Sequence, residues 1–589
     1  MEQAGNSPNN PPPDSAHALF DGLSAASRHF IESIIGSLSP ANRADSSEIL
    51  RALTASLQAD TERCAEMQQR YYRQHLELWM NLARAGDGAA APAAPVAAPD
   101  KGDRRFHAPE WQTLPYFDYL KQAYLINSRW LTDLVETAQL APPAKNKLRF
   151  FTRQLIDAAA PANFAPTNPE VIKLAAATKG ESLARGLEHL SADAKKGRIS
   201  MTDESAFEIG RNIALTPGTV VYENELMQLI QYAPATDTVY ARPLVMVPPC
   251  INKYYILDLQ PHNSFAGYAV AQGHTVFMVS WRNVPADMGH LTWDQYVQDG
   301  VIKALDVARD ICGVAQVNVL GFCVGGTLVG AALAVLAAQG NPAAASVTLL
   351  ATMLDFSDPG ELSVFVDEAY VHQREQDFAQ GGVLRGKELS LTFSSLRAND
   401  LIWSYVVNNY LKGGKPDAFD LLYWNSDSTN LPGAMFVYYI RNTYLENNLR
   451  SPGKLTMCGE RVDLSSVELP TYILATREDH IVPWKTAYQS TQLLGGDIKF
   501  VLAGSGHIAG VVNPPAKKRR NHWTNAGLPA TAEDWFAGAT SLAGSWWPDW
   551  INWLAAYGGA KIPPPAAQGN ENYPPLEPAP GRYVRERCD

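Results

Sequence analysis

From residue 206 onward, short apolar and β-branched runs alternate with segments of helical periodicity, and this pattern constrains the fold more than any other feature of the sequence. A strand that is apolar on both faces lies inside a sheet, and helices between consecutive strands make those strands parallel. We therefore predict an α/β domain over residues 206–562, with a mostly parallel sheet covered by helices on both faces. The predicted strands are 244–251, 274–281, 317–323, 346–355, 470–479 and 498–507, with helices at 293–312 and 325–340.

Residues 355–464 interrupt this alternation. The block has no regular strand–helix pattern and is rich in aromatic and Asn residues, among them Trp403, Tyr439 and Tyr444. A long insertion between two strands of a sheet most simply forms a lid over one edge of that sheet. We predict a cap subdomain over these residues.

The first 103 residues have a different composition. Residues 1–17 are rich in Pro, Asn and Ser and are predicted to be disordered, and residues 86–103 form an Ala/Pro linker. Between Leu53 and Leu82, apolar residues recur at steps of three, four and seven, which predicts an amphipathic helix. Such a helix packs on its own chain or docks a partner or a hydrophobic surface.

Two further regions flank the α/β domain. Residues 104–205 are predicted to form a helical N-terminal domain, with helices at 116–138 and 145–158 separated by Pro-containing turns. Residues 563–589 form a Pro-rich C-terminal tail.

Composition excludes several classes of protein. The chain has 49 basic and 60 acidic side chains and a net charge of −11, which argues against a protein that coats nucleic acid. The six cysteines form no CxxC pair, no secretory signal is recognisable, and the most apolar stretch, Val324–Ala338, is shorter than the roughly 20 residues that span a bilayer. We expect a soluble cytoplasmic protein with no transmembrane segment and no nucleic-acid partner.

One pentapeptide combines a reactive side chain with a constrained turn. Gly321, Phe322, Cys323, Val324 and Gly325 lie between a predicted strand and a helix, as in the G-x-nucleophile-x-G turn of the α/β-hydrolase fold with Cys in place of Ser. The turn requires small flanking residues and places the thiol at a helix N-terminus, which favours a thiolate. The alternative is a buried core cysteine beside a glycine turn.

Two later strands end in the residues that would complete a nucleophilic site. Asp479 and His507 each close a predicted strand, and they follow Cys323 in the order nucleophile, acid, histidine that is typical of this fold. We predict a Cys–His–Asp triad. His480 competes as a base but does not close a strand, and is either a residue that lines the site or a surface histidine.

Two backbone N–H groups are candidates for an oxyanion hole. One belongs to Val324, directly after the nucleophile, and the other to Ile251, which follows the strand that supplies the second donor in this fold. For the thiol of the adjacent Cys250, core packing is favoured over catalysis. The sequence has no Walker loop, dinucleotide-binding motif or zinc-ligand spacing, so we expect no cofactor and no metal.

Four adjacent basic residues run from Lys517 to Arg520, shortly after His507. They form either a solvated face or a local attractor for a phosphate-bearing substrate.

Several longer segments surround these candidates: PPCINKYYILDL (248–259), VSWRN (279–283), GFCVGGTL (321–328), TREDHIVPW (476–484), GSGHIAGVVNPP (504–515) and GSWWPDW (544–550). These segments resemble the polyhydroxyalkanoate synthases, and the similarity covers the chain from about Arg104 to the C-terminus. The length and the single-chain N-terminal extension resemble class I of that family.

The resemblance implies a reaction. The substrate is an (R)-3-hydroxyacyl-CoA thioester of short chain, such as 3-hydroxybutyryl-CoA, and the product is a polyester that grows on the enzyme with release of CoA. Cys323 attacks the thioester and His507 acts as general base. Asp479 either orients His507 or activates the 3-hydroxyl group of the incoming unit.

The resemblance also implies surroundings and partners. Arg397 and His480 are expected to line the CoA entrance, and Asp258 to lie near the site. A cap covers the site, the enzyme works as a homodimer, and its location is the surface of cytoplasmic polyester granules, where the N-terminal region meets granule-associated proteins. Two other functions stay open: a Cys-dependent acyl-CoA thioesterase or hydrolase of the same fold, and a non-catalytic inclusion-surface protein that adsorbs through the 53–82 helix.

Overall fold

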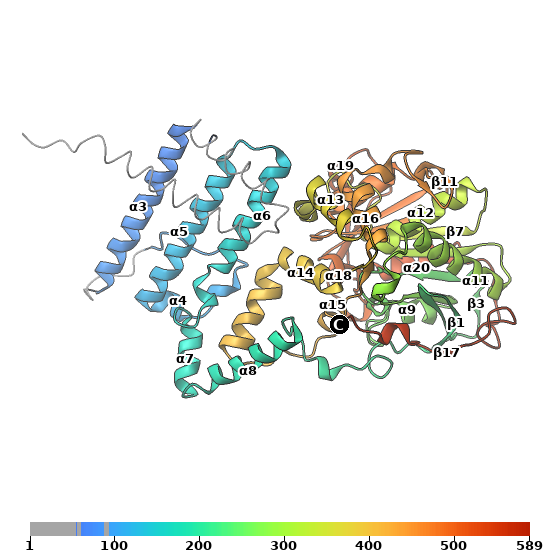
Figure 1. Cartoon of the computed structure of the whole chain (residues 1–589), viewed down its shortest axis with the longest axis horizontal. Helices are drawn as coiled ribbons and strands as arrows, with labels where there is room; N and C mark the ends of the chain where they lie inside the picture. Colours follow the sequence, from blue (N-terminus) through green and yellow to red (C-terminus); the bar gives the residue numbers. More distant parts are fainter. Residues whose placement is uncertain (1–54, 56–59, 87–93, 589) are drawn as a thin grey trace, which may run out of the picture. The chain divides into compact units, whose positions relative to one another are not determined.

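The computed structural model describes residues 55, 60–86 and 94–588 (Figure 1). The predictions made for residues 1–17, for Leu53 and Leu57, and for residues 87–93 of the linker lie outside these ranges. The chain divides into two compact units, Met1–Ala177 and Thr178–Asp589.

The first unit is helical. Helix α3 packs along α5, and α5 along α6, as the blue and cyan ribbons of Figure 1 show. α3 is amphipathic as predicted, because Met67 and Leu78 are buried whereas Glu66 and Glu77 are exposed. The predicted helices 116–138 and 145–158 are confirmed as α5 and α6, each with Pro in its first turn. Among the described residues of this unit, the α-helices are α3 (Thr61–Gly86), α4 (Glu110–Thr113), α5 (Pro115–Thr137), α6 (Pro142–Ala158) and α7 (Pro169–Ala177).

The division between the units comes earlier than the expected boundary at residue 205. Helix α8 (Glu181–Lys196) belongs to the second unit because it packs on η10 (Val406–Leu411) of the insertion. The Tyr410 hydroxyl donates to Asp193 at 2.7 Å, and a Cβ on Gly186 would lie 1.8 Å from the Tyr410 carbonyl oxygen. Only glycine permits so close an approach of two backbones.

An eleven-stranded sheet forms the centre of the second unit, in the order β15-β14-β13-β12-β7-β6-β4-β5-β2-β1-β17. The six strands from β13 to β5 in this order are parallel, as predicted, and antiparallel strands extend the sheet at both sides. All six predicted strands are present. The strands of this sheet are β1 (Gly218–Glu223), β2 (Met227–Tyr232), β4 (Leu244–Val247), β5 (Val276–Trp281), β6 (Val317–Phe322), β7 (Ala344–Leu350), β12 (Thr471–Thr476), β13 (Ile498–Ala503), β14 (Asn521–Thr524), β15 (Thr540–Ala543) and β17 (Glu577–Pro578).

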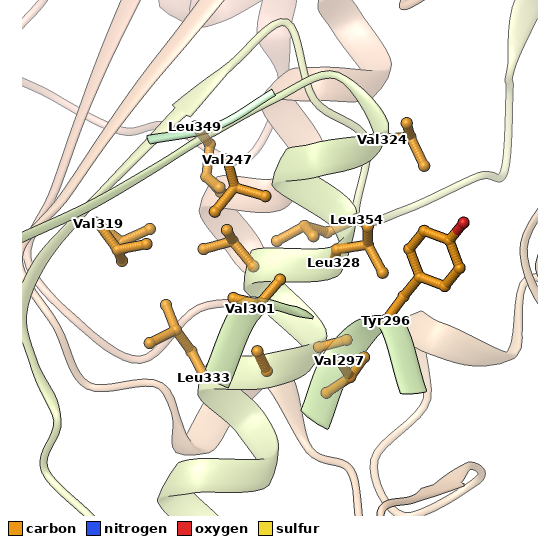
Figure 2. Packing of buried hydrophobic residues seen from close by; sticks show 14 of the residues in the cluster. Val247, Tyr296, Val297, Val301, Val319, Val324, Leu328, Leu333, Leu349 and Leu354 are labelled. Atoms are coloured by element: carbon orange, nitrogen blue, oxygen red, sulfur yellow. The ribbon is translucent and has the colours of Figure 1, made fainter. Parts of the chain in front are cut away.

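Each face of the sheet carries its own hydrophobic core. Side chains alternate along the strands, so that Val319 joins one core while Leu320 and Phe322 join the other. Figure 2 shows the first core, where strand residues such as Val247 and Leu349 gather beside helix α12 with Leu328. Helices α9 and α20 contribute to the second core through Phe265 and Trp550. The sheet is therefore buried on both faces, which explains its uniformly apolar strands.

The predicted helix 293–312 is continuous but passes through one wide turn. It consists of α10 (Trp293–Gln295), the π-helical segment η7 (Tyr296–Ile302) and α11 (Lys303–Cys312). The remaining helices outside the insertion are α9 (Phe265–Ala271), α12 (Val324–Ala338), α17 (Trp484–Gln489), α18 (His507–Val511), α19 (Ala532–Ala537) and α20 (Trp547–Ala555).

The chain leaves the sheet after β7 and returns at β12. The intervening insertion consists of short helices and two small antiparallel sheets of two strands each. Its main helices are α13 (Glu368–Asp377), α14 (Gly386–Leu396), α15 (Asp420–Asn425) and α16 (Gly433–Ile440), with π-helical segments η9 (Asn399–Trp403), η10 and η11 (Arg441–Leu445).

The C-terminal residues pack on the α/β domain. β17 pairs with β1 at one side of the sheet, and Tyr583 and Val584 are buried. The segment expected as a Pro-rich tail thus adds a strand and core side chains to the domain. Within the described ranges, no helix is both long and apolar enough to cross a membrane.

Candidate active site

Cys323 occupies a tight turn between β6 and α12. Its backbone has φ 53° and ψ −126°, a conformation that is strained for a residue with a side chain. A Cβ on Gly321 would lie 2.4 Å from the Gly326 Cα, and a Cβ on Gly325 would lie 2.3 Å from the Val247 carbonyl oxygen. Both glycines are therefore required by neighbouring backbone, as the pentapeptide predicts.

The thiol of Cys323 is at the amino end of a buried helix. Cys323 is the N-cap of α12, and its carbonyl accepts from the N–H groups of Gly326 at 2.9 Å and Thr327 at 3.3 Å. Val324 is the first helical residue, so its N–H has no acceptor within the helix. The helix dipole and this donor favour negative charge beside the sulfur.

His507 and Asp479 form a buried pair. The His507 Nδ1 atom lies 2.7 Å from the Asp479 Oδ2 atom, and their side chains are 4% and 0% exposed. Asp479 also accepts from the Thr476 hydroxyl at 2.8 Å and from the backbone N–H groups of Ile481 and Val482 at 2.9 and 2.8 Å. These bonds hold the carboxylate and thereby the orientation of the imidazole.

The electrostatics of this pair favour an imidazolium beside the thiol. Burial opposes charge on His507, but Asp479 and a hydrogen-bonded Cys323 outweigh it and raise the pKa of His507 to about 10. Burial likewise opposes charge on Asp479, yet His507 and the two backbone donors lower the pKa of that carboxyl below its ordinary value. Phe322 stacks on the imidazole at 5.5 Å and covers its face. The site therefore favours a charged imidazole next to Cys323.

Aromatic side chains of the insertion lie within electrostatic range of Cys323. Burial raises the pKa of Tyr439 and of Tyr444, and the electrostatic interaction with Cys323 adds to both shifts. Tyr444 contacts Phe356 with ring centroids 5.0 Å apart, and Tyr439 stacks on Trp293 at 5.2 Å. The aromatic richness of residues 355–464 was the sequence signal for these side chains, but no pattern in it distinguishes these two tyrosines from the others.

The loop after β4 presents Ile251 next to the same edge of the sheet. The Ile251 carbonyl accepts from the N–H of Thr429 at 2.9 Å, and the Cys250 carbonyl accepts from the Thr429 hydroxyl at 2.6 Å. Residue 429 belongs to the insertion, so the insertion determines how these peptides are turned. Burial raises the pKa of the Cys250 thiol to about 12, which favours packing for that side chain.

His480 and Arg397 lie in the electrostatic neighbourhood of the pair. His480 is half-buried, and burial lowers its pKa to about 4 although Asp479 opposes the shift. Its Nδ1 atom has no hydrogen-bond partner in the described part of the chain. Arg397 is close enough to His480 to lower that pKa further, and it pairs with Asp400 at 2.8 Å.

The expected site residue Asp258 is part of the scaffold. It is 1% exposed and accepts from the hydroxyls of Thr216 at 2.5 Å and Ser264 at 2.7 Å. Ser264 in turn caps α9. Burial raises the pKa of Asp258, and these hydroxyls partly offset the shift. None of its hydrogen bonds within the described residues reaches Cys323 or its partners.

The basic run from Lys517 to Arg520 is an exposed loop between α18 and β14. Arg520 lies within electrostatic range of Glu478, the residue before Asp479. The loop therefore lies at the same edge of the sheet as the His507–Asp479 pair.

Comparisons with known proteins show which families the chain resembles. The family model described as the N-terminus of poly-beta-hydroxybutyrate polymerase (PhaC) matches residues 102–269, and an alpha/beta hydrolase fold model matches residues 243–514. A protein named poly(3-hydroxyalkanoate) polymerase subunit PhaC from Cupriavidus necator is 54% identical over 89% of this chain and 88% of its own. One of the same name from Rhizobium meliloti is 42% identical, covering 90% and 87%. A poly(3-hydroxyalkanoate) polymerase from Methylorubrum extorquens is also 42% identical, covering 92% and 90%.

Proposed function

Because the chain belongs to the poly(3-hydroxyalkanoate) polymerase family, we propose that it polymerises short-chain (R)-3-hydroxyacyl-CoA thioesters, such as 3-hydroxybutyryl-CoA, with release of CoA. The observation that carries this proposal is the position of Cys323, in a strained turn at a helix N-terminus beside the buried His507–Asp479 pair. In this proposal the three residues are the catalytic triad.

The first step is acylation of Cys323. The thiolate attacks the thioester carbonyl carbon, and the carbonyl electrons move onto oxygen, where the N–H groups of Val324 and Ile251 stabilise them. As the tetrahedral intermediate collapses, the bond from carbon to the CoA sulfur breaks. The imidazolium of His507 gives its proton to that leaving sulfur, which leaves a neutral imidazole and an acyl-enzyme.

The second step transfers the acyl group to a hydroxyl. The neutral His507 takes the proton from the 3-hydroxyl of the next unit, the oxygen attacks the acyl carbon, and the Cys323 thiolate leaves. A new ester bond forms and the ion pair is restored. Asp479 accepts four hydrogen bonds, from His507, Thr476, Ile481 and Val482. This full coordination supports its role in orienting His507 over direct contact with the substrate hydroxyl.

Cysteine suits this cycle because the acyl-enzyme is itself a thioester. Exchange between two thiols costs little free energy, so the acyl group keeps its reactivity toward an alcohol. Water competes with that alcohol, and the aromatic cover that includes Tyr439 and Tyr444 is the proposed means of excluding it.

The substrate and partner surfaces are part of the same proposal. Arg397, His480 and the exposed basic loop at Lys517 to Arg520 face the entrance and attract the phosphates of CoA in this scheme. The proposed assembly is a homodimer on the surface of cytoplasmic polyester granules, with the N-terminal region contributing to both contacts. Deletion of residues 1–100 is then expected to weaken dimerisation, activity or granule binding, as sedimentation and granule pull-down will measure.

The decisive experiment combines 3-hydroxybutyryl-CoA with the Cys323→Ala and Cys250→Ala variants. We expect the first variant to release CoA at least about 10³-fold more slowly than the parent and the second to stay near the parental rate. Parental CoA release by Cys323→Ala overturns the proposal. The product separates the alternatives, because a thioesterase yields the free hydroxy acid whereas a polymerase yields insoluble polyester.

A further inference from the structure

Lys253 is a buried cation that the proposed cycle does not use. It lies two residues after Ile251 in the loop that follows β4, and it is 2% exposed. Its Nζ atom donates to the main-chain carbonyls of Tyr583, at 3.4 Å, and of Glu586. An ammonium group is buried only where acceptors replace its water, so these two carbonyls have a specific purpose in the fold.

The segment that offers these carbonyls is held firmly by the domain. The N–H of Tyr583 donates to the Gln228 side chain at 3.1 Å, and its hydroxyl donates to the Asn224 carbonyl at 2.9 Å. Arg585 donates to the Ile209 carbonyl at 2.8 Å, and Val584 is buried in the second core. We call residues 583–587 the C-terminal turn. It holds the two carbonyls that accept from the Lys253 ammonium in a fixed position.

The insertion holds the same loop from its other side. The Trp424 indole N–H donates to the Lys253 carbonyl at 2.7 Å, and Asn252 and Ser428 form an isolated antiparallel β-bridge. Together with the two bonds from Thr429, the carbonyls of Cys250, Ile251 and Lys253 all accept from the insertion. The loop is thus placed between residues 424–429 and the C-terminal turn.

We propose that Lys253 is a positioning residue which latches this loop to the C-terminal turn and so aims the Ile251 N–H at the developing oxyanion. This inference rests on the proposed function, because it assigns a reaction role to that N–H. Lys253 itself touches no reacting atom. Its ammonium anchors the loop at one end while the insertion anchors the carbonyls, and with either anchor lost the N–H points away from its target.

The test replaces Lys253 by Met, which keeps the aliphatic chain and removes the donor. In the full chain with 3-hydroxybutyryl-CoA, we expect kcat for CoA release to fall about 10- to 100-fold. This loss is smaller than the loss expected when an oxyanion donor is removed altogether. KM is expected to change less than about threefold. Alkylation of Cys323 by iodoacetamide is expected to stay at the parental rate, because the thiol and His507 are untouched. Lys253→Arg, which retains a cation, is expected to recover part of kcat.

Lys121 supplies the matched control. It is also a buried lysine, 5% exposed, and its Nζ atom donates to the Trp111 carbonyl at 2.7 Å in the helical unit. Lys121→Met removes the same group at equal burial, so it reports general destabilisation. We expect its kcat to stay within about twofold of the parent.

A second variant tests the latch without changing Lys253. Removal of residues 583–589 deletes both acceptor carbonyls, and in combination with Lys253→Met it is expected to lower kcat no further than either change alone. Additive losses overturn the inference, as does a kcat for Lys253→Met within twofold of the parent. Equal loss of Cys323 alkylation and kcat also overturns it, because the defect then lies in the fold. Failure of the proposed function has a different sign: Cys323→Ala in the otherwise parental chain then releases CoA at the parental rate.

Discussion

The turn at Cys323 and the loop at Ile251 follow neighbouring strands, β6 and β4, but different forces hold them. The Cys323 turn is determined mainly by its own glycines, because a side chain on Gly321 would collide with the following turn and one on Gly325 would collide with the end of β4. The Ile251 loop takes its shape from partners more than 170 positions away in the chain, in the insertion and at the C-terminal turn. One half of the candidate site is thus encoded locally and the other half by distant segments.

This difference has a consequence for the proposed reaction. The Cys323 N–H donates to the Leu350 carbonyl of the sheet, whereas the carbonyls beside Ile251 accept from residues 424–429 of the insertion. A shift of the insertion is therefore expected to affect the Ile251 loop more than the Cys323 turn. Substitutions near the Cys323 turn and in the segments that hold the Ile251 loop are expected to separate the two contributions.

The largest effect is expected at the His507–Asp479 pair, which interacts electrostatically with Cys323. Asp479→Asn removes the charge that raises the pKa of His507, so the imidazole loses its proton near neutral pH and no longer stabilises a thiolate. We expect kcat to fall about 10³- to 10⁴-fold, and alkylation of Cys323 at pH 7 to slow with it. Stopped-flow CoA release and mass-spectrometric alkylation measure the two. Asp549→Asn, which removes a carboxylate from the Lys499 ion pair, is the control.

The local half is broken by a single methyl group. Gly325→Ala places a Cβ 2.3 Å from the Val247 carbonyl oxygen and 2.6 Å from that of Pro248, so the turn and the end of β4 must separate. We expect at least a 10²-fold loss of kcat and an overpacking cost of about 1–3 kcal/mol in urea denaturation. Gly102→Ala, where the added atom meets nothing within 4 Å, should change neither. Near-parental activity of Gly325→Ala would show that the turn is not sterically determined.

A smaller effect is expected from the loss of a single hydrogen bond between the insertion and the Ile251 loop. Thr429→Val removes the hydroxyl donor to the buried Cys250 carbonyl while keeping the side-chain shape. An unsatisfied buried acceptor costs about 1–3 kcal/mol, so a loop that shifts in response lowers kcat about tenfold. Cys323 alkylation should not change. Thr392→Val deletes an equivalent hydroxyl on the exposed face of α14 and serves as the control; equal kcat values for the two variants would contradict the role given to the insertion.

A substitution at the edge of the sheet opposite to the candidate site is expected to change stability without changing activity. His274, just before β5, is 1% exposed and neither ring nitrogen has a hydrogen-bond partner in the described residues. Burial, aided by Lys561, lowers its pKa to about 4, below the ordinary 6.5. The unfolded chain therefore binds this proton first as the pH falls, so the stability that the neutral ring provides is complete above pH 6.5 and is lost between about 6.5 and 4.

His274→Phe removes that proton-binding group and keeps the stacking on Tyr240, whose ring centroid is 4.6 Å away. On going from pH 7 to pH 5, the variant should lose about 2 kcal/mol less unfolding free energy than the parent, as urea titrations at both pH values measure. Its kcat at pH 7 should be parental. His372→Phe is the control for the substitution itself, because it replaces a histidine whose side chain is 65% exposed.

Much of the α/β domain was predictable because its signals are local. Six apolar runs identified six strands, and the residues that close β12 and β13 pointed to Asp479 and His507. The same approach misplaced the division between the units, because the periodicity of α8 reveals its apolar face but not its partner η10. It also treated the C-terminal residues as a tail, since nothing in a Pro-rich segment reveals a pairing with β1.

The sequence by itself determined the glycines of the Cys323 turn and the strands that end near Asp479 and His507, because residue size and apolar runs are properties of short segments. Only the tertiary structure decided the environment of each titratable group. His507 and His274 are both buried, yet the pKa of one is raised to about 10 by Asp479 and Cys323 while that of the other is lowered to about 4 by burial without a partner. The same holds for Lys253, whose purpose depends on carbonyls some 330 residues later. Desolvation and hydrogen bonding act through space, and proximity in space is what folding adds to the sequence.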